Sequence, residues 1–376
     1  MSGRGFDVIV IGGGLHGLSA ALHLARGGKR VVILERSWVG RHASGASAAG
    51  VRTLNRALEE LPIALEAMDM WHNISSLVGS DCGFHANGQI QVAETAEGAA
   101  VLERRLQKSR AAGFSHEEMI DRAELRRLVP AIAPHCVGGL TVRTDGAADP
   151  HKTLEAFRRS AEAAGVVVEE GRGVTAITRR GADWVVRAGS RDFTAPHVVN
   201  AAGAWAAKIA AMVGDDIALG HKASLMMVTE RIAPFLKPVV SLVGRPLSFK
   251  QTDQGTLVIG GGLQGRADIE AQKSFVDFSQ LSRSARAVTD LFPMTASLRI
   301  VRSWAGMEAK TADLLPVIGP SPQAEGFVHV FGFSGHGFQL VPVVGAIVSD
   351  LIIHGGTNRM IAPFAAERLM SARTVA

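Results

Sequence analysis

The sequence predicts an α/β protein in which a doubly wound, mostly parallel sheet is joined to a discontinuous α+β region built on an antiparallel sheet. Three observations support this fold class. A β-branched apolar run near the N-terminus leads into closely spaced glycines and an amphipathic helix. The alternation of strands and helices returns after residue 149, and runs typical of antiparallel strands fill the segments between. Because a chain of 376 residues is too long for one compact core, we expect two domains.

The N-terminus predicts a strand, a glycine turn and a helix in immediate succession. Residues 6–11 read as a strand that is buried on both faces of a parallel sheet. Gly12, Gly14 and Gly17 follow at the GxGxxG spacing. The first glycine permits a tight turn, the second lets the backbone approach a pyrophosphate, and the third lets the next helix pack against the strand. This order of elements indicates a Rossmann-like dinucleotide site, with the positive end of the helix facing the phosphates.

A second strand and an acidic residue extend this unit. Residues 31–34 form an apolar strand that ends at Glu35, whose carboxylate can accept both hydroxyls of an adenosine ribose. Glu35 argues against a nicotinamide cofactor that carries a 2′-phosphate. The small-residue run from Arg36 to Gly50 then lets the main chain lie against an extended cofactor. FAD is the more extended dinucleotide, so we expect FAD rather than NAD, with a flexible linker as the alternative interpretation of the run.

The rest of the chain divides between two styles of structure. We assign residues 1–80, 141–215 and 301–376 to the Rossmann-like FAD-binding domain, and residues 81–140 and 216–300 to a substrate domain. The strand at 198–205 ends on small residues, which we expect to contact the cofactor beyond the carboxyl end of the strand. The expected helices cover residues 15–26, 54–71, 97–111, 123–128, 151–164, 278–291 and 338–354, and the further expected strands cover 88–93, 166–169, 173–178, 184–187, 224–229 and 257–260.

Composition excludes several classes of function. Only Cys82 and Cys136 occur, and neither belongs to a Cys-x-x-Cys pair, so we expect no disulfide scaffold and no metal site. The formal charge is +5, but Lys and Arg are scattered, so we expect no nucleic-acid partner. The chain has no tyrosine, which rules out a catalytic tyrosine. No run of about 18 apolar residues and no signal-like segment is visible, so we expect a cytoplasmic enzyme without a transmembrane segment.

The C-terminal part contains a second glycine-rich turn. A strand leads into residues 331–339, which read Phe-Gly-Phe-Ser-Gly-His-Gly-Phe-Gln and open a long helix. The N-terminal end of that helix would stabilise negative charge at the pyrimidine edge of a reduced flavin.

Taken together, these motifs resemble the D-amino-acid oxidase family of flavoproteins. The resemblance is to the branch that contains glycine oxidase, sarcosine oxidase and the β subunits of opine and D-hydroxyproline dehydrogenases. It rests on the first glycine motif with Glu35, the small-residue run 44–50, Asn-Ala-Ala-Gly-Ala-Trp at 200–205, Trp-Ala-Gly at 304–306 with Asp313 and Pro316, and Gly-Phe-Ser-Gly-His-Gly at 332–337. It implies bound FAD, hydride transfer from an α-carbon to the flavin, and an imino acid product.

The departures from the family pattern concern the flavin link and the substrate carboxylate. Gly306 stands where monomeric sarcosine oxidases attach the flavin through a cysteine, so we expect non-covalent FAD. Gln339 and Gly335 stand where relatives place a lysine or an arginine that holds the substrate carboxylate. Arg52 is our candidate for that role, with a structural ion pair as the alternative, and Arg302 and Lys250 are weaker candidates.

The candidate site residues follow from these motifs. We expect Arg52, His336 and Gln339 to act on the substrate, although His336, like His42, could instead bond only to backbone. The residues expected to contact FAD are Gly12, Gly14, Leu15, His16, Gly17, Glu35, Arg36, Ala43, Ser44, Ala46, Ser47, Ala48, Ala49, Gly50, Val174, Ala201, Ala202, Gly203, Trp205, Gly306, Gly335, His336, Gly337, Phe338 and Gln339.

The expected activity is oxidation of the C–N bond of a small amino or imino acid by hydride transfer to FAD. The run 45–54 most resembles β subunits of opine and D-hydroxyproline dehydrogenases, which implies a possible second subunit or other electron acceptor as partner. The alternatives are a glycine or D-amino-acid oxidase that acts alone, an FAD-dependent 2-hydroxy acid dehydrogenase, and an accessory flavin-bearing protein without activity of its own.

Overall fold

The parallel sheet predicted at the N-terminus is present. The computed structural model describes residues 5–370. Strands β1 (Val8–Ile11) and β2 (Val31–Leu34) pair in parallel and are connected by helix α1 (Leu15–Arg26). The six-stranded sheet has the order β20-β21-β12-β1-β2-β8, in which only the edge strand β20 is antiparallel to its neighbour. Its other strands are β8 (Val167–Glu169), β12 (His197–Asn200), β20 (Val317–Pro320) and β21 (Phe327–Phe331).

The two faces of this sheet carry different layers, and the strand sequence shows why both are apolar. Val8 and Val10 pack with the core on the helical face, whereas Ile9 and Ile11 pack on the other face. Helices α1, α6 (Pro150–Ala163) and α9 (Gly337–Ile353) share the first core. A three-stranded antiparallel sheet, rather than a second layer of helices, covers the other face. It consists of β9 (Val174–Arg180), β10 (Asp183–Ala188) and β11 (Arg191–Ala195), and its first two strands match those expected over residues 173–178 and 184–187.

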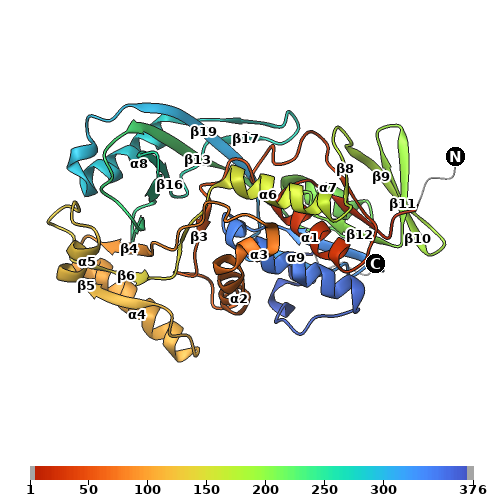
Figure 1. Ribbon diagram of the computed structural model, residues 1–376, viewed down its shortest axis with the longest axis horizontal. Coiled ribbons are helices and arrows are strands. Elements are labelled where there is room, and N and C mark those ends of the chain that lie inside the picture. Colours follow the sequence, from red (N-terminus) through yellow and green to blue (C-terminus); the bar gives the residue numbers. More distant parts are fainter. Residues whose placement is uncertain (1–4, 371–376) are drawn as a thin grey trace, which may run out of the picture.

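An eight-stranded sheet forms the second half of the molecule, with the order β19-β13-β16-β15-β14-β4-β6-β5. Figure 1 shows it to the left of the parallel sheet, with β13 and β19 running towards the centre. Its strands are β4 (Gln89–Ala93), β5 (Glu118–Asp121), β6 (Gly138–Val142), β13 (Gly220–Arg231), β14 (Val239–Leu242), β15 (Ser248–Gln251), β16 (Thr256–Gly260) and β19 (Ile300–Lys310). Its helices are α4 (Ala96–Ala111), α5 (Arg122–Leu128) and α8 (Phe278–Leu291).

The fold class is therefore the predicted one, while the domain boundaries stay a prediction. Sheet membership refines one of them: β19 pairs with β13 along almost its whole length, although residues 301–310 were assigned to the FAD-binding domain. Two short ribbons lie outside the large sheets, β3 (Gly50–Val51) with β7 (Gly146–Ala147) and β17 (Arg266–Asp268) with β18 (Lys273–Phe275). The remaining elements are α3 (Ile74–Val78), α7 (Ala206–Ala211), η1 (Gly203–Trp205), η2 (Pro293–Thr295), η3 (Ala362–Phe364) and η4 (Ala366–Leu369).

One predicted helix begins later than expected. The helix expected over residues 54–71 is α2 (Leu61–His72), so about its first two turns are absent. The reason is a distant carboxylate: Asp145 accepts hydrogen bonds from the backbone N–H groups of Thr53 and Leu54, each at 2.8 Å. These bonds hold the chain in a turn, and Pro62 at the start of α2 suits the first turn of a helix.

Helices α1 and α9 cross closely beneath the parallel sheet. A Cβ added at Gly345 of α9 would lie 2.2 Å from the Ser19 hydroxyl oxygen of α1, so only glycine allows this approach. The contact fixes the N-terminus of α9 relative to the first glycine turn. No helix within residues 5–370 is long and apolar enough to cross a membrane.

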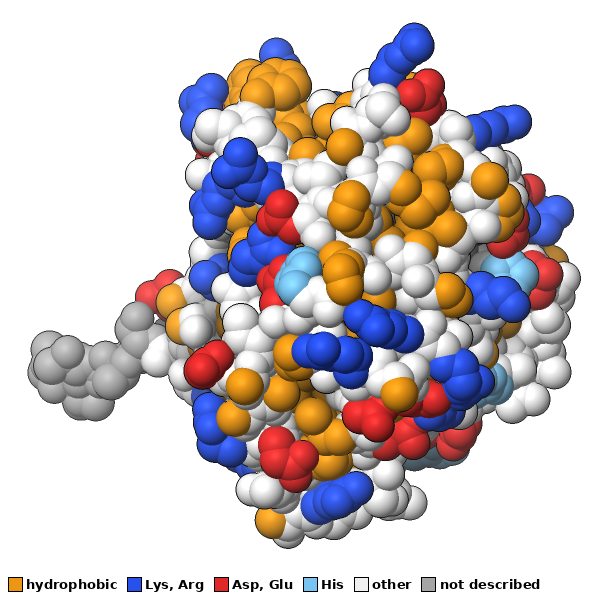
Figure 2. Space-filling view, turned by 90° about the vertical axis from the view of Figure 1, so that its left-hand side faces the viewer, with side chains coloured by type: hydrophobic (Ala, Val, Ile, Leu, Met, Phe, Trp, Pro, Cys, Tyr) orange, Lys and Arg blue, Asp and Glu red, His pale blue; other side chains and the backbone are white. Residues whose placement is uncertain are grey.

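Surface charge is mixed on the face that Figure 2 shows. Lys and Arg side chains lie there among acidic and apolar ones, without a continuous basic area. This distribution agrees with the scattered positions of Lys and Arg in the sequence.

Candidate active site

The carboxyl ends of four strands meet at one edge of the parallel sheet and open into a cavity of about 830 Å³. The residues that follow these strands, Gly12, Glu35, Ala201 and Gly332, all line it. Ligands of doubly wound sheets bind at this edge. The cavity continues to the eight-stranded sheet, so the two halves of the fold enclose it together.

The first glycine turn is built as the motif predicts. Gly12 has a φ of +111°, and a Cβ there would lie 2.4 Å from the Ala201 carbonyl oxygen. A Cβ on Gly17 would lie 2.0 Å from the Gly12 carbonyl oxygen. Gly17 therefore packs α1 against the turn and does not line the cavity, which corrects the expectation that it contacts FAD directly. Gly14 does line it, and its nearest neighbour is the Ser44 hydroxyl, 3.1 Å from an added Cβ.

Glu35 lies at the end of β2, where the ribose-binding acid was expected. Its side chain is mostly buried and lines the cavity. One carboxylate oxygen accepts the Gly13 backbone N–H and the other accepts the Ser37 backbone N–H, both at 2.8 Å. These two bonds fix the orientation of the carboxylate while leaving acceptor capacity on each oxygen.

The small-residue run forms one wall of the cavity. The Ser44 hydroxyl accepts the Leu15 backbone N–H at 3.0 Å, which ties the run to the first turn of α1. Trp304 Nε1 donates to the Ala46 carbonyl oxygen at 3.0 Å, which ties it to β19. A Cβ on Gly306 would lie 2.9 Å from Ala46 Cβ. The run is thus hydrogen-bonded on two sides, to α1 and to β19.

Most of the other expected cofactor contacts also line the cavity. Arg36 and Trp205 meet there, with the guanidinium 4.7 Å from the centre of the indole ring. The expected residues that line the cavity are Gly12, Gly14, Leu15, His16, Glu35, Arg36, Ala43, Ser44, Ala46, Ser47, Ala48, Ala49, Gly50, Val174, Ala201, Ala202, Gly203, Trp205, Gly306, Gly335, His336, Gly337 and Phe338.

The size and chemistry of this cavity fit FAD. A ribose-directed acid, a glycine turn at a helix N-terminus and a wall of small residues occur in the order of an extended dinucleotide. A cavity of about 830 Å³ lies within the range of about 300–1,000 Å³ that is typical of ligand and cofactor sites. The glycine loop 332–337 and the N-terminus of α9 border the end of the cavity that adjoins the eight-stranded sheet.

A cluster of charged residues that the sequence did not single out lies at that same end. Lys222 and Ser224 on β13 and Glu308 on β19 all line the cavity. Glu308 Oε1 accepts the Ser224 hydroxyl at 2.6 Å and lies 3.3 Å from Lys222 Nζ, which donates to the Ser334 carbonyl oxygen at 2.9 Å. The sequence signal was the period of two: residues 222, 224, 306 and 308 face one side of a strand pair whose register joins Ser224 to Gly306.

Arg52 lines the cavity as a cation without a carboxylate partner. Its Nη1 donates to the carbonyl oxygens of Leu54 and Asn55. Among residues 5–370, no carboxylate forms an ion pair with it. Burial, and then the nearby Arg56, lower the pKa of Arg52 to about 10, so the side chain is still charged at neutral pH.

His336 lines the cavity beside the N-terminus of α9, but Gln339 does not. Gln339 is fully buried: its Oε1 accepts from Arg56 Nη2 at 3.0 Å and its Nε2 donates to the Ala64 carbonyl oxygen at 2.6 Å. The helical turn between the two residues directs Gln339 into the core beneath the cavity. The expectation that Gln339 contacts cofactor or substrate is therefore corrected.

The two weaker candidates for the carboxylate also lie elsewhere. Arg302 is exposed, with its guanidinium 5.5 Å from the ring centre of Trp304. Lys250 Nζ donates to the Ala148 carbonyl oxygen at 2.6 Å, and burial lowers its pKa to about 8. Neither residue lines the cavity, whereas His42 does, with its ring centre 4.6 Å from that of Trp205.

Comparison with known proteins gives the same assignment. The family described as FAD dependent oxidoreductase matches residues 7–351. Glycine oxidase of Geobacillus kaustophilus is 26% identical over 96% of this chain and 97% of the relative, and its crystal structure has a TM-score of 0.89 with coverage of 98% and 100%. The β subunit of sarcosine oxidase from Rhizobium meliloti is 24% identical over 96% of this chain and 88% of the relative.

A further solved structure is similar over nearly the whole chain. L-Proline dehydrogenase from P. horikoshii has a TM-score of 0.90 and 25% identity, and the similarity covers 97% of this chain and 98% of that chain. The family match spans far more than half of the sequence and contains both glycine turns, Glu35 and the loop before α9. The chain therefore belongs to the DAO family of FAD-dependent oxidoreductases, and it is a flavoenzyme that binds FAD.

Proposed function

We propose that this enzyme oxidises the C–N bond of a small amino or imino acid, of the sarcosine, D-hydroxyproline, opine or D-amino acid type. One observation carries the proposal: the end of the cavity beside the loop 332–337 is lined by both an unpaired cation, Arg52, and a carboxylate, Glu308. A zwitterionic amino acid has the complementary pair of charges. The names of the relatives support the same class, since glycine, sarcosine and proline are all amino or imino acids.

Each residue at this end has a defined task in the proposed reaction. The Arg52 guanidinium binds the substrate carboxylate, because a partly buried cation without an ion-pair partner favours an anionic ligand. Glu308 attracts the substrate nitrogen, and Ser224 and Lys222 hold its Oε1 in place. Two anchors on one small molecule fix its α-hydrogen in a single orientation, which is the main contribution that positioning makes to the rate.

The zwitterion first loses one ammonium proton to solvent, and hydride transfer then starts from the neutral amine, so the chemical step itself needs no side-chain base. FAD, when bound, supplies the acceptor for the hydride that leaves the α-carbon. The free N–H groups at the N-terminus of α9 stabilise the negative charge that develops beside the loop 332–337. The chain contributes orientation and electrostatics, and the imino acid product leaves or hydrolyses.

Glu308 is the observation that favours an amine over a 2-hydroxy acid. Arg52 would still bind the carboxylate of a hydroxy acid, but such a molecule has no positive charge for Glu308 to attract, so it lacks the second electrostatic contact that an amino acid makes. The test is an anaerobic titration of the purified holoprotein with glycine, sarcosine, D-proline, D-hydroxyproline and opines. We expect at least one of them to bleach the flavin absorbance, and failure of every amine would reject the proposal.

The Arg52 assignment has its own test. Arg52→Ala should weaken the binding of the substrate at least about 30-fold, the lower end for truncating one partner of a buried charge pair. FAD binding should be retained, because the guanidinium is not part of the glycine turn or the small-residue wall. Unchanged apparent substrate affinity in Arg52→Ala would show that another group binds the carboxylate.

We also propose that the electrons leave the reduced enzyme through a second polypeptide. The support is that one relative, matched over 88% of its length, is by its name a β subunit. After anaerobic bleaching, admission of air should leave the flavin reduced for minutes, and a co-purified partner should restore turnover. Reoxidation within seconds would instead identify an oxidase that acts alone.

A further inference from the structure

A buried ion pair lies directly behind the loop that carries His336. Arg56 and Glu60, in the segment just before α2, are only 2% and 1% exposed. Arg56 Nη1 lies 3.5 Å from Glu60 Oε1. Arg56 Nη2 donates to the His336 carbonyl oxygen at 2.9 Å and to Gln339 Oε1 at 3.0 Å. The pair therefore contacts the first residues of α9 beside the cavity, which Arg56 also lines.

Such a pair is not explained by stability. Removing two charges from water is expensive, and well-packed apolar residues of similar volume usually give an equal or higher free energy of unfolding. Arg56 also donates from Nε to the Arg52 carbonyl oxygen at 3.2 Å, so the pair contacts two segments that line the cavity and is more simply explained by what it does there. The hydrogen bonds from Arg56 account for the position of the His336 backbone, but they leave the role of Glu60 open.

Three polar atoms around this pair lack any hydrogen-bond partner among residues 5–370. They are Arg56 Nη1, Glu60 Oε1 and His336 Nδ1, and all three are buried. His336 Nδ1 lies 3.9 Å from Glu60 Oε2, which is too long for a hydrogen bond. Buried polar atoms almost always have a partner, and one internal water can satisfy two to four of them. We expect such a water, or a small shift of the imidazole, to connect His336 Nδ1 with the Glu60 carboxylate.

The two ring nitrogens of His336 lie in different surroundings. Nδ1 is buried beside Glu60, whereas Nε2 is not among the buried atoms and His336 lines the cavity. Burial, followed by the positive charges of Arg52, Arg56 and Lys222, lowers the pKa of His336 to about 2, so the ring is neutral at neutral pH. A neutral imidazole has one donor nitrogen and one acceptor nitrogen, and an ionised carboxylate can only accept. Glu60 therefore selects the tautomer that carries its proton on Nδ1.

We propose that Glu60, held by Arg56, is a positioning residue that keeps His336 Nε2 as a hydrogen-bond acceptor for the N–H of the substrate amine. The inference rests on the proposed function, because the amine is the donor. As the hydride leaves the α-carbon with its electron pair, the nitrogen lone pair forms the C=N bond and the nitrogen becomes positive. The N–H stays on the nitrogen, so its hydrogen bond to Nε2 strengthens in the transition state and lowers the barrier.

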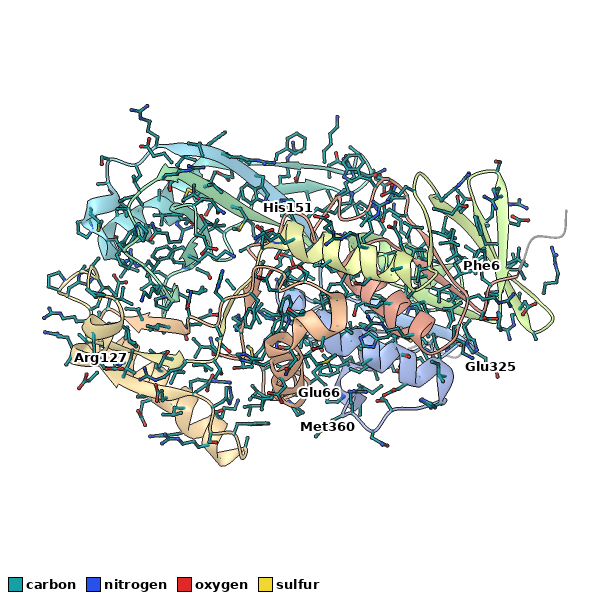
Figure 3. All side chains as sticks on the ribbon, in the orientation of Figure 1. Phe6, Glu66, Arg127, His151, Glu325 and Met360 are labelled. Atoms are coloured by element: carbon teal, nitrogen blue, oxygen red, sulfur yellow. The ribbon has the colours of Figure 1, made fainter. Side chains whose placement is uncertain are left out.

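The test is Glu60→Gln, because glutamine keeps the shape but can both donate and accept, and so no longer dictates the tautomer. The matched control is Glu66→Gln, six residues further on and within α2. Glu66 also binds an arginine, Arg359, with N–O distances of 2.7–3.0 Å, but it does not line the cavity. Figure 3 places Glu66 near Met360, at the lower edge of the molecule in that view.

The first readout is independent of any substrate. In ¹⁵N-histidine-labelled holoprotein, assigned with His336→Gln, the wild type should show a protonated Nδ1 and an unprotonated Nε2 from pH 5 to 8. Glu60→Gln should shift the populations towards the other tautomer, and Glu66→Gln should not. A protonated Nε2 in the wild type, or an unchanged tautomer in Glu60→Gln, would overturn the inference. Because no substrate is needed, this result stands apart from failure of the proposed function.

The second readout compares substrates that differ only in the N–H. For a secondary amine such as sarcosine, Glu60→Gln should slow anaerobic flavin bleaching by about 10²-fold, as expected for the loss of one preorganised transition-state hydrogen bond. For N,N-dimethylglycine, which has no N–H as a neutral amine, the same variant should change the rate less than threefold. An equal loss for both substrates would indicate a purely structural role and would refute the proposal.

Glu60→Gln leaves the Arg56 charge unpaired in the core and could prevent folding. The double variant Arg56→Gln and Glu60→Gln removes both charges and leaves the same free choice of tautomer. It should reproduce the ¹⁵N shift and the selective loss on sarcosine. If it folds and shows the wild-type tautomer, Glu60 is not the group that selects it.

Discussion

The glycine turn at Gly12 allows a sharp quantitative prediction, because the chain contains a matched control. Both Gly12 and Gly28 have positive φ values, +111° and +83°. A Cβ at Gly28 meets no atom within 4 Å, whereas a Cβ at Gly12 lies 2.4 Å from the Ala201 carbonyl oxygen and 2.8 Å from its carbon. Gly28→Ala therefore measures the backbone strain alone, and Gly12→Ala measures strain together with a steric clash.

The magnitudes follow from these two contributions. An L-residue in the left-handed region costs about 1–2 kcal/mol, which is our expectation for Gly28→Ala. Overpacking adds about 1–3 kcal/mol, so Gly12→Ala should lower the free energy of unfolding by about 2–5 kcal/mol. Urea denaturation of the two apoproteins measures the difference. FAD affinity, measured by quenching of flavin fluorescence, should fall at least about tenfold in Gly12→Ala, as a loss of about 1.4 kcal/mol would give, and should be unchanged in Gly28→Ala.

The refuting result is equally defined. If Gly12→Ala and Gly28→Ala lose the same stability and both retain wild-type FAD affinity, the turn does not pack against Ala201 as described. The assignment of this turn as part of the cofactor cradle would then be wrong.

Three further predictions test other parts of the account. Glu308→Gln should weaken the binding of proline about tenfold or more, because a charge-assisted hydrogen bond is worth about 1.5–3 kcal/mol. It should not weaken the binding of tetrahydrofuran-2-carboxylate, in which oxygen replaces the cationic nitrogen. Titrations of the flavin spectrum measure both affinities, and an equal change in both would exclude a contact between Glu308 and the nitrogen. Trp304→Phe removes the hydrogen bond to the Ala46 carbonyl oxygen. It should weaken FAD binding by about 2- to 12-fold, the equivalent of about 0.5–1.5 kcal/mol, without loss of the fold. Unchanged FAD affinity would show that this hydrogen bond does not hold the small-residue wall of the cavity. Burial, followed by the charge of Arg26, lowers the pKa of His23 to about 4, so below about pH 6.5 the unfolded chain binds a proton that the folded chain does not. The free energy of unfolding should therefore fall as the pH drops from about 6.5 towards 4. Urea titrations at pH 7, 6 and 5 should show a shallower fall for His23→Gln than for the wild type, and an identical slope would contradict this.

The fold of the FAD-binding half could be predicted because its signals are local. A buried strand, a glycine turn, an apolar helix face and Glu35 all occur within the first 35 residues, and each has its own mechanism. The start of α2 could not be predicted in the same way. It depends on Asp145, which is 92 residues away from Thr53 and caps the preceding turn only when the tertiary structure brings the two together.

The substrate end was less predictable for a related reason. Lys222 and Glu308 look like ordinary surface charges in the sequence, and only the pairing of β13 with β19 places them at the cavity. Gln339 shows the converse: the loop before it lines the cavity, but one helical turn is enough to direct its side chain to Arg56 and the Ala64 carbonyl oxygen. Cofactor contacts follow from motifs, whereas substrate contacts depend on strand register and helical phase.

The central claim is that the cavity selects an amino acid over the hydroxy acid with the same carbon skeleton. The most direct measurement is anaerobic flavin reduction by matched pairs, glycine with glycolate and D-alanine with D-lactate, alongside proline with tetrahydrofuran-2-carboxylate, followed by quantification of the product. The account predicts bleaching by at least one amino or imino acid, one equivalent of imine or its hydrolysis product per flavin, and no bleaching by the oxygen partner. Bleaching by glycolate or D-lactate without bleaching by the corresponding amine would contradict it.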